Sequence, residues 1–203
     1  MIYLDTKMCG YDDFAIGFPS VETCMAIVVE TTNRLIGWHA SSGTDTFFEG
    51  AVKFGGYVKR KREGQAVAHV YGISHVHRFT EGKTAKKEII HQLRSVAAEV
   101  GLRAGTFAIL EGTSAELVEF RRIGANRLCD VFYAANTSVT YNKGEISPSA
   151  AKHRTLHPTQ GNKPIKLYGG DDDRAPIVES VSLVNDGQGL HKLKLTDLKK
   201  FSC

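Results

Sequence analysis

The sequence has few of the residues that mark redox, zinc-binding or membrane proteins. Its 203 residues include 4 cysteines and contain no Cys-x-x-Cys pair, which argues against a zinc knuckle or a dithiol redox motif. No apolar run approaches the ~18 residues that a membrane-spanning helix requires. An acidic residue follows the first four positions, too early for the core of a signal peptide. We therefore expect a soluble protein that is made in the cytoplasm without a cleaved export signal.

The chain also has no large excess of positive or negative charge. The 26 basic and 22 acidic residues leave a net charge of +4 that is spread along the chain, so neither a nucleic-acid nor a membrane partner is indicated. A hydrophobic fraction of 42% with 24% charged residues is typical of a globular protein with a buried core. In a chain of this size without a signal peptide, we expect the thiols to stay reduced.

Hydrophobic patterning predicts strands alternating with helices up to about residue 143. Apolar runs over 23–29 and 35–39 indicate a hairpin of strands buried on both faces, and helical spacing of apolar residues covers 44–62, 84–101 and, behind a capping box, 113–123. Further strands are expected at 1–4, 14–18, 66–73, 106–110, 127–133 and 138–141. The prediction is an α+β (α/β sandwich) fold, in which helices cover two packed, mixed or antiparallel β-sheets.

The last 60 residues have weaker signals. Loop dipeptides and short apolar runs follow residue 143, and they are too brief for a separate core. We expect a catalytic domain over 1–143 and a loop-rich extension over 144–203 that packs on the same domain, with an edge strand over 176–184.

The predicted hairpin brings two reactive side chains to the same face. If Thr31 and Thr32 form its two-residue loop, Cys24 lies directly opposite His39. A loop at Thr32 and Asn33 places the pair one diagonal apart, still on one face. An imidazole at this position can take the thiol proton, and the thiolate is the nucleophile that attacks a carbonyl carbon. Cys24 and His39 are therefore the candidate catalytic residues.

This arrangement resembles the catalytic hairpin of the CheD-like glutamine deamidases. The resemblance rests on Cys24, an apolar strand, a turn and a second strand that reaches His39 fifteen positions later, and this spacing is most similar to that of the cytotoxic necrotizing factor toxins. Members often carry Gly-Ser before the cysteine, where this chain has Glu22 and Thr23. Several members place a threonine six positions before it, where this chain has Phe18.

The resemblance implies a CheD-like architecture and a cysteine-dependent protein glutamine deamidase. Its partner would be a protein with a reactive glutamine, it would need no cofactor and no metal, and transglutamination would follow when a primary amine replaces water. The toxin branch implies a bacterial effector delivered into a target or host cell, whereas the chemoreceptor deamidase branch implies a chemotaxis enzyme. A backbone carbonyl of Phe18 or Pro19 is expected to orient the histidine, and Ser20 and Thr23 are candidate orienting or oxyanion residues.

Two other functions remain open. Another Cys-His hydrolase, such as a protease or a thioesterase-like enzyme, would use the same pair with a different leaving group. A partner-binding module would use no chemistry at all. His75 and His77 are interpreted as surface or site-rim histidines, because no third metal ligand accompanies them.

Overall fold

The computed structural model describes most of the first 142 residues and parts of the remainder. The described ranges are 2–4, 6–41, 44–78, 82–111, 116–123, 129–135, 139–142, 154–156, 165–166, 180–183, 191–194 and 198–203. The expected domain boundary at residues 143 and 144 lies outside them.

Two sheets form the body of the molecule. The larger sheet has the order β12 (Ile165–Lys166), β2 (Met8–Asp12), β5 (Leu35–Ala40), β4 (Met25–Thr31), β6 (Val67–His75), β7 (Ala104–Leu110) and β15 (Lys199–Ser202). The second has the order β1 (Ile2–Tyr3), β3 (Ala15–Val21), β8 (Glu116–Arg121), β9 (Asp130–Ala135) and β14 (His191–Lys192). Each sheet is mixed, because β6 and β7 are parallel in the first and β1 and β3 in the second.

A smaller sheet and three helical segments complete the described elements. The small sheet has the order β10 (Val139–Asn142), β13 (Ser180–Leu183) and β11 (Arg154–Leu156). The helices are α1 (Thr44–Lys61), α2 (Gly82–Val100) and the short 3-10 helix η1 (Val76–Arg78). Within the described residues, neither α1 nor α2 is long and apolar enough to cross a membrane.

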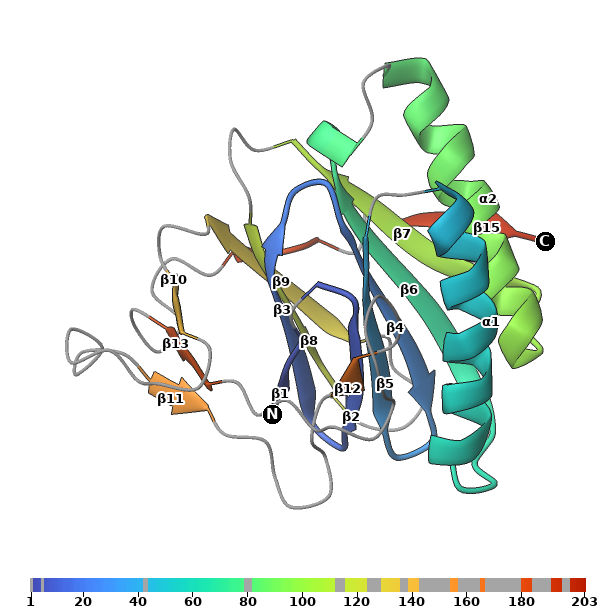
Figure 1. The fold of residues 1–203 in the computed structure, drawn as a ribbon, viewed down its shortest axis with the longest axis horizontal. Coiled ribbons are helices and arrows are strands. Elements are labelled where there is room, and N and C mark those ends of the chain that lie inside the picture. The colour runs from blue at the N-terminus through green and yellow to red at the C-terminus, as the bar shows by residue number, and fades with distance from the viewer. Residues whose placement is uncertain are drawn as a thin grey trace.

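The described elements form three layers: the two long helices, the larger sheet and the second sheet. Both long helices lie on one face of the larger sheet, and the second sheet lies on its other face (Figure 1). The central strand β4 shows why: Met25, Ile27 and Val29 join the helix-side core, whereas Ala26 and Val28 join the core between the sheets. The expected strand buried on both faces is confirmed. The mixed α/β sandwich is confirmed as well; among the described residues, both long helices lie on the larger sheet.

The structure differs from the prediction over 113–123 and at strand β2. The helix expected over 113–123 is strand β8, although residues 113–115 lie outside the described residues. Pairing with β3 on one side and β9 on the other buries Val118 and Phe120 between the sheets, and this tertiary context outweighs the local helix signal. Strand β2, which pairs with β5, was not predicted.

The C-terminal residues contribute to both large sheets. Strand β15 pairs with β7, and β14 pairs with β9. Phe201 is 4% exposed in the helix-side core, and Leu193 is 8% exposed in the core between the sheets. The edge strand expected over 176–184 is instead β13, which belongs to the small sheet.

Candidate active site

The β4–β5 turn sets the relation between Cys24 and His39. Glu30 pairs with Leu35 and Ala26 pairs with His39, so the loop residues are Thr32 and Asn33. The direct Cys24–His39 pairing is therefore wrong, and the alternative with the two residues one diagonal apart on one face is the observed register. Diagonal neighbours have Cβ atoms within ~7–8 Å, which long and aromatic side chains can span.

Two side chains hold this turn in place. Arg122 donates hydrogen bonds to the carbonyl oxygens of Asn33 and Thr32, each at 2.8 Å. The side-chain oxygen of Gln65 accepts from the hydroxyl of Thr31 at 2.7 Å and from the amide of Asn33 at 3.0 Å. The turn has no glycine, and polar contacts from two distant segments hold its Thr32-Asn33 loop in place.

Cys24 lies immediately before β4, at an end of the core between the sheets. Its side chain is 7% exposed, compared with 0% for Cys9 and 1% for Cys129. The hydroxyl of Thr6 lies 3.7 Å from the Cys24 sulfur, and Ser74 Oγ donates to the Cys24 carbonyl at 3.5 Å. Among the three buried thiols, Cys24 therefore has the most access to solvent and a polar neighbour on its sulfur.

Cys129 lies in a setting that suppresses thiol chemistry. Burial raises the pKa of its thiol, and the nearby Glu30 carboxylate raises it further. Glu30 is itself buried, accepts a hydrogen bond from Tyr71 at 2.7 Å, and has a raised pKa because of desolvation. A thiol held in its protonated form is a poor nucleophile.

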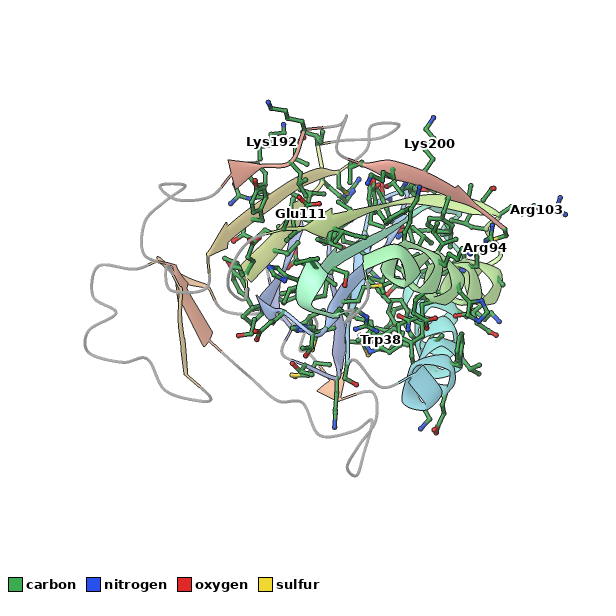
Figure 2. The ribbon with its side chains drawn as sticks, turned by 90° about the horizontal axis from the view of Figure 1, so that it is seen from above. Trp38, Arg94, Arg103, Glu111, Lys192 and Lys200 are labelled. Atoms are coloured by element: carbon green, nitrogen blue, oxygen red, sulfur yellow. The ribbon has the colours of Figure 1, made fainter. Side chains whose placement is uncertain are left out.

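The His39 side chain is fully buried, and a backbone carbonyl orients its ring. Its neighbour Trp38 faces the helix layer, 5.0 Å from Phe47 between ring centroids (Figure 2), so strand alternation turns His39 towards the second sheet. There, His39 Nδ1 lies 2.8 Å from the Leu4 carbonyl oxygen. Because a carbonyl only accepts, Nδ1 carries the proton, and Nε2 of the neutral ring carries the lone pair.

The connection between β1 and β2 contacts both candidate residues. Besides the Leu4 carbonyl on the His39 ring and the Thr6 hydroxyl on Cys24, the Lys7 amide donates to the His39 carbonyl at 2.8 Å. Lys7 has φ of 71°, a conformation that costs a non-glycine residue about 1 kcal/mol or more and is concentrated at functional sites. Sequence patterns missed this segment because its contacts join positions far apart in the chain.

Of the other residues expected near the site, Phe18 and Pro19 are buried, whereas Ser20 and Thr23 are exposed. Phe18 packs its ring edge-on against His39, with centroids 5.8 Å apart, and Pro19 is buried beside it in β3. The carbonyl placed on His39 is that of Leu4, not of Phe18 or Pro19. Ser20 is exposed and has φ of 59°. Thr23 is exposed, and its carbonyl accepts from Arg78 at 2.9 Å.

Arg78 links the segments that flank the candidate pair. Besides its bond to Thr23, which precedes Cys24, it donates to the Ser41 carbonyl at 3.3 Å, just after β5. It also donates to Gln92 of α2 at 2.8 Å. The Arg78 guanidinium therefore ties the segment before Cys24 and the segment after β5 to helix α2.

His75 differs from its sequence-based interpretation. Its side chain is 0% exposed at the end of β6, so the interpretation as a surface or rim histidine is wrong for this residue. The side chain of His77 lies outside the described residues.

In the described part of the chain, no group of three or more His, Cys, Asp or Glu side chains is placed to hold a metal ion. A surface pocket of about 370 Å³ lies instead at the ends of the two helices, lined by Val58, Lys59, Arg62, Val67 and residues 98–101. It includes none of the candidate catalytic residues. A thiol and an imidazole on one face of a hairpin are the groups that thiol chemistry needs, with the imidazole as the proton acceptor.

Comparisons with known proteins do not assign this site. The chain matches no protein-family model, and no curated protein matches it.

Proposed function

We propose that the chain is a cysteine-dependent protein glutamine deamidase in which Cys24 is the nucleophile and His39 the general base. The observation that carries the proposal is that a thiol next to the start of β4 lies one diagonal away, on the same face, from a buried imidazole whose Nδ1 donates to the Leu4 carbonyl at 2.8 Å. That bond fixes the tautomer in which Nε2 can accept the thiol proton. The resemblance to the CheD-like deamidases supports the same chemistry and a CheD-like architecture.

The proposed reaction proceeds through a thioester. Nε2 of His39 takes the thiol proton, and the Cys24 sulfur bonds to the carboxamide carbon of a glutamine in the substrate protein. The tetrahedral intermediate expels ammonia, which receives the proton from the imidazolium. Water, deprotonated by the same ring, then cleaves the thioester to release glutamate and the free thiol. A primary amine in place of water would give transglutamination.

The negative oxygen of the intermediate needs hydrogen-bond donors. The Cys24 amide is the first candidate, because the amide of the nucleophile lies beside the reacting carbonyl. Ser20 and Thr23 remain candidates for the second donor, since both precede Cys24 in an exposed segment. As a deamidase of the toxin type, the protein would be a bacterial effector whose partner is a host or target protein with an accessible glutamine.

Two assays separate this function from its rivals. A deamidase releases ammonia from a glutamine-containing protein without cutting its chain, whereas a protease produces fragments. A binding module would have no thiol whose alkylation depends on a histidine. We expect ammonia release by the wild type and by Cys203→Ser, which makes the same change at an exposed cysteine, but not by Cys24→Ser. Ammonia release that survives in Cys24→Ser would reject the proposal.

A further inference from the structure

A second histidine, His75, ends β6, the strand that pairs with β4 on the side away from β5. Strands β4 and β6 are antiparallel, with Ala26 paired to Ile73 and Met25 paired to Ser74. Continuing this register by one residue places His75 opposite Cys24. Ala26 and Ile73 both belong to the core between the sheets, and alternation puts Cys24 and His75 on that same face.

Hydrogen bonds hold the two chain segments together at and just beyond the last paired residues, Met25 and Ser74. Ser74 Oγ donates to the Cys24 carbonyl at 3.5 Å, and Arg78 Nη1 donates to the Thr23 carbonyl at 2.9 Å. These bonds lie on both sides of the Cys24–His75 pair along the chain. The segment that carries Cys24 is therefore tied to the end of β6.

The strand register places His75 closer to Cys24 than His39 is. Residues directly opposite in adjacent antiparallel strands have Cβ atoms roughly 4.5–5.5 Å apart, whereas diagonal neighbours are about 7–8 Å apart. Cys24 and His39 are diagonal. Because His75 is 0% exposed, an interaction of its ring with the sulfur would be shielded from water and correspondingly stronger.

We propose that His75 is a second functional histidine of this site, whose ring N–H stabilises the Cys24 thiolate by donating a hydrogen bond to the sulfur once the thiolate forms. No proton is transferred in this step; His39 remains the group that accepts the thiol proton. The inference rests on the proposed thiol chemistry of Cys24 and adds a residue that the Cys-His pair alone does not include.

The test is the rate at which iodoacetamide alkylates Cys24 at neutral pH, followed by mass spectrometry of the Cys24 peptide. His75→Phe removes the donor, and we expect it to slow alkylation roughly tenfold, the order expected for loss of a hydrogen bond to a charged group. His75→Gln keeps a side-chain N–H and should retain most of the wild-type rate. A purely structural role would not make the two variants differ in this direction.

His69→Gln is the matched control. His69 lies on the same strand and the same face, at the far end, where its Nε2 is 3.0 Å from the Thr106 hydroxyl. This variant should alkylate at the wild-type rate. Equal rates for His75→Phe and the wild type would overturn the inference, as would equal slowing by His75→Phe and His75→Gln.

A measurement on the wild type covers the case in which His75→Phe does not fold. Alkylation of Cys24 should shift the NMR resonances of the His75 ring nitrogens and leave those of His69 unchanged; unshifted His75 resonances would overturn the inference. The outcomes also separate the two proposals. Fast alkylation that depends on His75, without ammonia release, would support the role of His75 and reject deamidation. Ammonia release with alkylation indifferent to His75 would do the reverse.

Discussion

At the scale of single residues, His39 is oriented by a backbone carbonyl, which no substitution of Leu4 removes. The orientation can be tested at Gly37, two residues earlier on the same face of β5. A Cβ at Gly37 would lie 2.9 Å from Leu4 Cδ1 and 2.9 Å from Phe18 Cζ, so Leu4 and Phe18 would both have to move. These are the residues that contact the His39 ring.

We therefore expect Gly37→Ala to cost about 1–3 kcal/mol of stability through overpacking and to slow alkylation of Cys24 in the folded protein. Chemical denaturation and alkylation kinetics on the same sample measure both effects. Gly56→Ala is the control, because a Cβ there meets only the flexible end of Arg60 at 3.7 Å and alanine favours a helix. Unchanged reactivity in a destabilised Gly37→Ala protein would show that Leu4 does not orient a functional histidine.

Thr6 supplies a second test at this scale. Its hydroxyl is 3.7 Å from the Cys24 sulfur and can donate a hydrogen bond to a thiolate. Thr6→Val removes the hydroxyl and keeps the shape, so we expect severalfold slower alkylation of Cys24, whereas Thr6→Ser should stay close to the wild type. If Thr6→Val and Thr6→Ser react alike, the hydroxyl has no role in thiolate formation.

The sequence was informative about Cys24 and His39 because both lie in one hairpin, where a local pattern predicts which residues share a face. It was silent about Leu4, Thr6 and the buried position of His75. Their contacts with the site depend on how β1, β2 and β6 pack around β4 and β5, and no local pattern encodes that. The sequence allows two registers of the β4–β5 hairpin, because the side chains that hold its turn, Arg122 and Gln65, come from distant segments.

At the scale of secondary-structure elements, Arg122 tests whether this turn controls the site. Arg122 donates to the Thr32 and Asn33 carbonyls and to the Asp13 carbonyl, each at 2.8 Å. We expect Arg122→Gln to cost roughly 1–3 kcal/mol in chemical denaturation, through loss of charge-assisted hydrogen bonds.

Alkylation of Cys24 should nevertheless be unchanged in Arg122→Gln, because alternate burial of β4 on both faces still specifies the register. Lys59→Gln, a change at an exposed position of α1, is the control for loss of one positive charge. A large fall in Cys24 reactivity in Arg122→Gln would mean that the turn, rather than the core, sets the register.

The elements predicted best were those with long periodic patterns. Helices α1 and α2 and the β4–β5 hairpin were predicted within a few residues, since each buries a continuous apolar face. The helix expected over 113–123 was wrong because its capping signal is local, whereas Val118 and Phe120 of β8 are buried by strands that lie far away in sequence. Strand β2 escaped detection because Gly10 and Asp12 interrupt its apolar pattern.

At the scale of the whole molecule, the C-terminal residues belong to the cores of both sheets. The sequence predicts that removal of the chain from Lys152 onward damages substrate recognition more than Cys24 reactivity. Burial of Leu193 and Phe201 and the pairing of β14 and β15 lead us to expect loss of stability instead.

Phe201→Ala tests this expectation without a truncation. We expect it to cost about 3–5 kcal/mol, because it leaves a cavity against β7 and α2. Lys200→Ala, at an exposed neighbouring position of β15 that points away from the sheet (Figure 2), should cost little. A Phe201→Ala protein as stable as the wild type would show that β15 is dispensable and that the tail is free to serve recognition.

The most direct test of the proposed deamidase is the intact mass of candidate substrate proteins after incubation with the wild type, Cys24→Ser and His39→Ala. The account predicts that the wild type produces the mass increase of an amide-to-acid conversion at a glutamine, with no chain cleavage, and that both variants produce none while remaining folded. Conversion of the glutamine by folded Cys24→Ser, or fragments in place of the mass increase, would contradict it.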